Sequence, residues 1–143
     1  MLTATGIAAT GAVGVWLGTI VFFSFVVAPR AFSVLGDDEA GKLVNAVFPV
    51  YYSFGVALGV VGVAAGVGRG VVEEFSLYLG LYVATLGLSV SVAALSRLYL
   101  IPRIEDADES EDEDAFEKYH SLSVKLNSVM LVSVVAALVL WHF

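Results

Sequence analysis

Apolar residues occur in four long runs along this chain, and each run approaches or exceeds the length of a membrane-spanning helix. The runs without a charged side chain are residues 1–29, 43–68, 75–96 and 126–143. A helix needs about 20 mostly apolar residues to cross a hydrocarbon core about 30 Å thick. Runs this continuous do not show the alternation of barrel strands. The pattern predicts an all-α integral membrane protein, a single domain built as an up-and-down bundle of four transmembrane helices.

The four spans are expected at about 6–29, 47–68, 75–101 and 118–141. The last apolar run is short by itself, so its helix is expected to begin near Tyr119. Residues 102–117 then form a connecting loop, and the first connection has room for a short amphipathic helix. The second and third spans are joined by a short turn, which predicts antiparallel neighbours.

Lysine and arginine gather at one end of the predicted bundle. The connections after the first and third spans, with the adjacent helix ends, contain Arg30, Lys42, Arg97, Arg103, Lys118 and Lys125. The connection between the second and third spans contains Arg69 alone. Cytoplasmic loops of membrane proteins carry the excess of basic residues. We therefore expect a multi-pass protein of the cytoplasmic membrane with both termini outside.

The composition supports the membrane assignment and excludes some kinds of binding site. Of the 143 residues, 59% are hydrophobic and 15% are charged, whereas soluble domains have about 45–50% and about 25%. The sequence has no cysteine, which excludes thiolate metal sites. The net charge of −7 comes from residues 102–117, whose nine acids and one arginine leave the remaining chain at +1. An acidic chain is not expected to bind nucleic acid, whose phosphates require basic residues. Residues 102–117 are compatible with a solvated loop, with loose cation binding or with a protein from a halophilic source.

Small residues form stripes at helical spacing in three of the predicted spans. The stripes are Gly55, Gly59, Gly62 and Gly66 in the second span, Gly80, Ala84, Gly87, Ser91 and Ala94 in the third, and Gly14 and Gly18 in the first. In lipid, small residues at this spacing let helix backbones approach closely. The stripes predict either packing within the chain, which we favour, or a homo-oligomer.

Polar side chains gather at the basic end of the predicted bundle. His120, Ser123 and Asn127 have the spacing i, i+3, i+7, which places them on one face of the fourth helix. Polar residues at membrane depth usually face the bundle interior and mark functional sites. The candidate ligand-binding residues are His120, Asn127, Ser123, Arg97, Tyr51 and Tyr52. In the structural alternative, Asn127 and Ser123 form hydrogen bonds between helices, and Arg97 extends to the membrane surface.

Three functions are compatible with these residues. The first is binding or translocation of a small solute, ion or lipid headgroup, with His120 changing its protonation, Asn127 orienting the ligand and Arg97 holding negative charge. The second is a redox protein with a metal or haem bound by His120, with or without Met130. The third is a structural or assembly protein. The sequence has no familiar catalytic motif and specifies no metal or cofactor, so a non-enzymatic role beside membrane lipid is preferred.

Four short motifs resemble the transmembrane protein 205-like family. They are residues 22–29 with Phe32 and Leu35, residues 40–41 with 48–52, residues 100–104, and Phe116 with His120, Ser121, Ser123 and Asn127. The family pattern often has glycine where this chain has Ser121. The resemblance implies a four-span bundle and, from a eukaryotic member linked to platinum-drug resistance, export or trafficking of metal-like or thiol-conjugated compounds. The layout is also similar to copper-resistance D-type membrane proteins and to four-span haem-pathway oxidases, although this chain lacks the cysteines that copper handling favours.

Overall fold

A computed structural model describes residues 4–143, and helices occupy almost all of this part of the chain. In chain order the helices are α1 (Ala4–Phe22), α2 (Ala28–Leu35), α3 (Asp37–Glu73), α4 (Leu77–Leu95), α5 (Ile101–Glu109) and α6 (Glu113–Leu140). Two short π-helices, η1 (Phe23–Val27) and η2 (Ser96–Leu100), join α1 to α2 and α4 to α5 without a break. The all-α fold class is confirmed.

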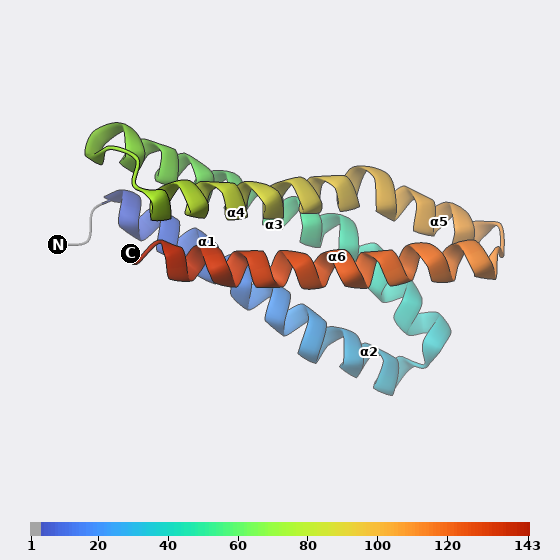
Figure 1. Ribbon diagram of the computed structural model, residues 1–143. Coiled ribbons are helices and arrows are strands. Elements are labelled where there is room, and N and C mark those ends of the chain that lie inside the picture. Colours follow the sequence, from blue (N-terminus) through green and yellow to red (C-terminus); the bar gives the residue numbers. More distant parts are fainter. Residues whose placement is uncertain (1–3) are drawn as a thin grey trace.

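Over residues 4–143, four continuous helical rods are long and apolar enough to cross a membrane. They are Ala4–Leu35, Asp37–Glu73, Leu77–Glu109 and Glu113–Leu140. α1 packs against α3 and α6, and α4 packs against the same two helices, so the rods form an up-and-down bundle (Figure 1). α1 begins and α6 ends at one end of the bundle, which we call the terminal end; α2 and α5 lie at the opposite end, which we call the proline end.

Glycines of α3 allow aromatic side chains into the middle of the bundle. Trp16 of α1 is 1% exposed, and a Cβ added at Gly55 would lie 2.5 Å from its indole nitrogen. Tyr82 of α4 donates a hydrogen bond from its hydroxyl to the carbonyl oxygen of Gly62 at 2.9 Å. The stripe of α3 therefore packs within the chain, as the sequence predicts.

The stripe of α4 behaves differently. A Cβ added at Gly80 or Gly87 would meet no atom of the described residues within 4 Å, and Ala84 and Ser91 on the same stripe are exposed. The interpretation as packing within the chain is wrong here, because α4 presents other residues to α3 and α6. The homo-oligomer stays a prediction, and α4 offers the surface for it.

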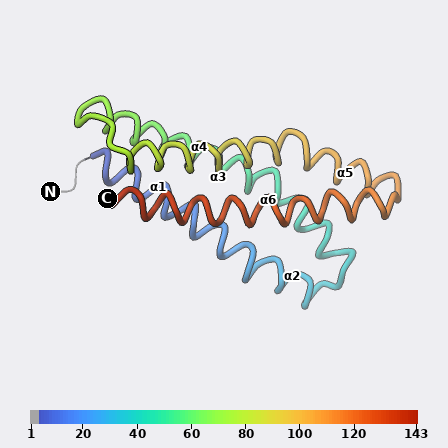
Figure 2. Tube along the Cα trace, viewed as in Figure 1, coloured from blue at the N-terminus to red at the C-terminus, as the bar shows by residue number. Residues whose placement is uncertain are grey.

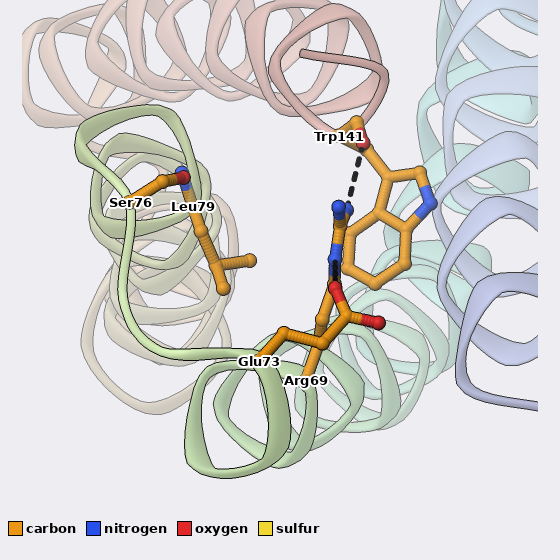
Figure 3. Close-up of polar contacts among 5 residues, drawn as sticks. All are labelled: Arg69, Glu73, Ser76, Leu79 and Trp141. Atoms are coloured by element: carbon orange, nitrogen blue, oxygen red, sulfur yellow. Dashed lines mark hydrogen bonds and ion pairs between the residues drawn. The ribbon is translucent and has the colours of Figure 1, made fainter.

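Side chains tie the end of α6 to α3 at the terminal end (Figure 3). Arg69 donates from Nη1 to the carbonyl oxygen of Trp141 at 3.2 Å and from Nε to the carboxylate of Glu73 at 2.8 Å. The guanidinium carbon of Arg69 lies 5.1 Å from the centroid of the Trp141 ring. This ring also packs on Tyr82, with centroids 4.9 Å apart. The terminal end is thus closed by packed side chains.

The connections between helices are shorter than the sequence pattern predicts. The amphipathic segment α2 continues α1 through η1 instead of standing apart in a loop, and Gly36 alone separates it from α3. Residues 102–117, expected as a loop, are mostly helical, and only residues 110–112 lie outside α5 and α6. Alanine and glutamate in this segment are good helix formers. Asp112 also caps α6 by accepting a hydrogen bond from the N–H of Ala115 at 3.1 Å.

A proline follows each of the two π-helices. In an α-helix the proline ring clashes with the carbonyl group four residues earlier. For Pro29 and Pro102 these carbonyls belong to Phe25 and Leu98, which lie inside η1 and η2. The wider π turn relieves the clash without ending the rod. Pro49, close to the expected start of the second span at about residue 47, lies inside α3 because that helix begins as early as Asp37.

Candidate functional site

Three polar side chains from three different helices meet near the proline end. The hydroxyl of Tyr51 in α3 donates a hydrogen bond to the amide oxygen of Asn127 in α6, with the two oxygens 2.6 Å apart. The amide nitrogen of Asn127 donates to Oγ of Ser24 in η1 at 3.0 Å. Such bonds between helices contribute about 0.6 kcal/mol each on average in a membrane. Asn127 therefore forms the interhelical bonds that the structural alternative predicts.

A cavity of about 430 Å³ lies beside this cluster, between the segment η1–α2, α3 and α6. We call it the α2–α6 pocket. Its lining residues are Phe23, Ser24, Phe25, Ala28, Pro29, Phe32, Val44, Phe48, Tyr52, His120, Ser123, Val124, Asn127, Ser128 and Leu131. Within the described chain α2 does not pack against α6, whereas η1 reaches α6 through the hydrogen bond between Ser24 and Asn127. α2 diverges visibly from α6 (Figure 1). The pocket is the space that this divergence leaves.

The walls of the pocket are mainly aromatic and aliphatic. Phe48 packs against Phe23 and Tyr52 on one wall, with ring centroids 5.7 Å and 5.9 Å apart. The polar groups are hydroxyls, one amide and one imidazole, and none of the described lining residues is Asp, Glu, Lys or Arg. Taking an unpaired charge into an apolar site costs several kcal/mol. The arrangement therefore suits a molecule with an apolar body and an uncharged polar group.

The structure brings most of the predicted site residues together. Tyr52, His120, Ser123 and Asn127 line the pocket, and Tyr51 contacts it through its hydrogen bond to Asn127. Ser123 is 3% exposed and donates to the carbonyl oxygen of His120 at 2.7 Å. Its predicted bond between helices is wrong, because its own helix supplies the acceptor.

His120 is exposed and lies at the edge of the pocket. Its ring stacks on Phe116, one turn earlier in α6, with centroids 5.9 Å apart and an interplanar angle of 3°. This contact holds the imidazole along the helix surface. The ring is thus placed to meet the polar group of a ligand that lies in the pocket.

Arg97 does not join these residues. It is half-buried on η2, and within the described chain it has no ion pair and no side-chain hydrogen bond. It is also absent from the described residues that line the pocket. Arg97 therefore does not share the pocket with His120 and Ser123, with which the sequence grouped it.

Metal and haem ligation find little support in the described chain. It contains no group of three or more His, Cys, Asp or Glu side chains that could hold a metal ion. Met130 is 1% exposed in the bundle core, and ten residues of helix place it about 15 Å along the axis from His120. His120 and Met130 therefore do not ligate one iron, which corrects that version of the haem hypothesis.

A second concavity, of about 440 Å³, lies where the acidic segment meets the start of α3. Its lining residues are Asp38, Ala107, Asp108, Glu111, Asp112, Glu113 and Phe116. The carboxylates are solvent-exposed, and the described residues here form no metal-holding group. Loose cation binding by the acidic segment stays a prediction.

Sequence reasoning missed one whole wall of the pocket. Ser24, Phe23 and Phe25 come from η1, and all three line the pocket. Ser24 offered a faint signal, since it is the single polar side chain among residues 20–29. No local pattern indicated that it would meet Asn127, because they lie 103 positions apart in the chain.

Two comparisons with known proteins find relatives. The domain family described as "Domain of unknown function (DUF4149)" matches residues 11–113, which include all of α2, α3, α4 and α5. A protein of Aquifex aeolicus (strain VF5), described as "Uncharacterized protein", is 34% identical over 117 residues, which cover 82% of this chain and 81% of the relative. No solved structure matches.

Proposed function

This chain belongs to the DUF4149 family, and we propose that it binds an uncharged amphiphile from the membrane in the α2–α6 pocket. The amphiphile has an apolar chain or ring system and a neutral polar group such as a hydroxyl or carbonyl. The apolar part lies against the phenylalanines of the pocket, and the polar group lies near His120 and Asn127. The observation that carries the proposal is the lining, which combines apolar walls with uncharged hydrogen-bonding groups.

Exposure of the lining residues supports access from lipid. Phe25 of η1 is 67% exposed and Val124 of α6 is 54% exposed, and both also line the pocket. In a membrane, these exposed faces meet acyl chains. A hydrophobic ligand therefore reaches the pocket sideways, between η1 and α6, without crossing water.

The closed terminal end supports binding over translocation. Trp16 fills the space beside Gly55 and Gly59, and Arg69 with Trp141 closes the end of α6. The ligand enters and leaves at the proline end. We propose that this end faces the cytoplasm, since the basic residues of the sequence gather there.

The relation to the transmembrane protein 205-like family is also a proposal. It is supported by the position of the motif residues, several of which line the pocket from three separate segments of the chain. These residues are Phe23, Ser24, Phe25, Ala28, Pro29, Phe32, Phe48, Tyr52, His120, Ser123 and Asn127. A shared ligand class would explain why motifs far apart in the sequence converge on one cavity.

Photocrosslinking tests the proposed function. The full-length protein in lipid nanodiscs is exposed to a long-chain alcohol that carries a diazirine, the alcohol probe, or to the matching carboxylate. We expect the alcohol probe to label peptides from η1, α3 and α6 at the pocket, and the carboxylate to label them several-fold less. Equal labelling by both probes would contradict the neutral-ligand chemistry.

A pair of substitutions on one helix provides the control. Val124→Trp places a large ring in the pocket and should abolish labelling there. Val132→Trp makes the same change at a position of α6 that is 68% exposed and away from the described pocket lining, and it should leave labelling unchanged. Labelling that survives Val124→Trp would mean that the probe binds the general lipid-facing surface.

A further inference from the structure

The first and third rods have the same internal design. Each consists of a helix, a π-helix and a second helix whose second and third residues are Pro-Arg. The internal landmarks of the first rod recur 73 positions later: Phe23 and Ser96 begin the π-helices, Pro29 pairs with Pro102, and Arg30 pairs with Arg103. The two rods also run in the same direction through the bundle (Figure 2).

Burial follows the same register. Val13 and Leu86 are 1% and 0% exposed, and Ile20 and Ala93 are both 0% exposed. Each pair is separated by 73 positions, so corresponding residues of the two rods face the core. The molecule is therefore built from two helical hairpins that are structural repeats, α1–η1–α2–α3 and α4–η2–α5–α6. Repeats of this kind, related by an axis along the membrane normal, occur in transporters.

The two repeats differ in how one corresponding segment of each packs against the rest of the bundle. We call these segments the first arm (η1–α2) and the second arm (η2–α5). The second arm packs against its own hairpin partner α6 and also against α3 of the other repeat. In the first arm, α2 packs against its partner α3 but not against α6 in the described chain, and η1 reaches α6 only through the Ser24–Asn127 hydrogen bond among the described residues. Accordingly, Ala107 of the second arm is 5% exposed, whereas its counterpart Val34 is 77% exposed. The α2–α6 pocket lies where the corresponding contact of the first arm is absent.

We propose that the first arm is a gate that closes onto α6, as the second arm already closes onto α3. Both ends of the arm are built to bend. In η1 the N–H of Ala28 bonds the carbonyl oxygen of Phe23 in a wide turn, and Pro29 contributes no N–H. At its other end, Gly36 has a φ of 76°, a conformation that glycine adopts without steric strain.

The role of the gate rests on the proposed function. An amphiphile between the first arm and α6 replaces the contacts that the second arm makes with α3. Closure around the ligand brings Phe32 and Val34 toward α6 and shields the polar group near His120 from water. Closure without a ligand removes the pocket.

Distances between spin labels test the gate, and the cysteine-free sequence gives a clean background for them. Val34→Cys with Ser121→Cys reports on the first arm and α6, and Asp106→Cys with Leu43→Cys reports on the second arm and α3. In nanodiscs we expect two distance populations for the first pair. The fraction of molecules at the shorter distance should change when the alcohol probe is added. The second pair should give one population that the probe does not change.

Two matched proline substitutions locate the hinge. Pro29→Ala restores an N–H and should shift the populations of the first pair, whereas Pro102→Ala, in an arm that is already packed, should leave the second pair unchanged. A single narrow distance for the first pair, insensitive to both the probe and Pro29→Ala, would overturn the gate. Two populations that ignore the probe would support the gate and contradict the proposed ligand, while labelling of a rigid pocket would support the ligand alone.

Discussion

At the scale of single residues, Asn127 connects the site to the fold. Its side chain accepts from Tyr51 at 2.6 Å and donates to Ser24 at 3.0 Å, so one amide joins α6 to α3 and η1. In lipid these groups have few alternative partners. The same amide borders the α2–α6 pocket, which couples the geometry of the pocket to the packing of three helices.

A double-mutant cycle measures this connection. Tyr51→Phe and Asn127→Ala each remove one side of the bond, and we expect a coupling free energy between about 0.6 and 1.7 kcal/mol for unfolding. The measurement is the free energy of unfolding in mixed detergent micelles. Ser128→Ala is the control, because that hydroxyl bonds the carbonyl oxygen of Val124 in its own helix. A coupling near zero would show that the bond does not join the helices.

At the scale of helices, two glycine stripes with similar spacing have different roles. Gly59 lies against Trp16 and Val90, so that a Cβ would overlap both side chains. A Cβ added at Gly80 would have no atom within 4 Å in the part of the chain that the structure describes. Spacing alone does not separate these cases, because it marks a smooth helix face and not the neighbour that fills it.

Alanine substitution distinguishes the stripes. Gly59→Ala should destabilise the protein by about 1–3 kcal/mol through overpacking, while Gly80→Ala should be neutral or slightly stabilising because alanine favours helix. Thermal unfolding followed by circular dichroism measures both. A larger stability loss for Gly80→Ala than for Gly59→Ala would contradict the packing.

The predicted homo-oligomer is tested by Gly80→Leu, which should lower the mass seen by light scattering and leave the fold intact.

At the scale of the whole molecule, the bundle has one closed end and one open end. Arg69 and Trp141 close the terminal end, whereas the pocket and both arms lie at the proline end. The basic residues of the sequence other than Arg69 lie toward the proline end too. If this end faces the cytoplasm, the pocket is filled from the inner leaflet.

Single cysteines report the orientation. Val72→Cys, at a site 83% exposed near the terminal end, should react with a membrane-impermeant maleimide added to intact cells. Glu109→Cys, at the exposed end of α5, should react only after the cells are permeabilised. The reverse pattern would place both termini in the cytoplasm and the pocket in the outer leaflet.

Much of the fold follows from the sequence alone. A stretch of about 20 apolar residues has few stable arrangements other than a helix across the membrane, so the four spans and the alternating direction of the rods follow from local composition. The same reasoning placed His120, Ser123 and Asn127 on one face of α6. These inferences succeed because each depends on residues close together in the chain.

Only the tertiary structure decided which side chains meet. Ser24 of η1 meets Asn127 of α6 through a hydrogen bond, whereas Arg97 of η2 is not among the described residues that line the pocket. The pocket exists because one arm diverges from α6 although its repeat packs closely. The local sequence pattern predicts the helices and gives the positions of their prolines. Cavities and hydrogen bonds between distant segments instead depend on the packing of all four rods at once.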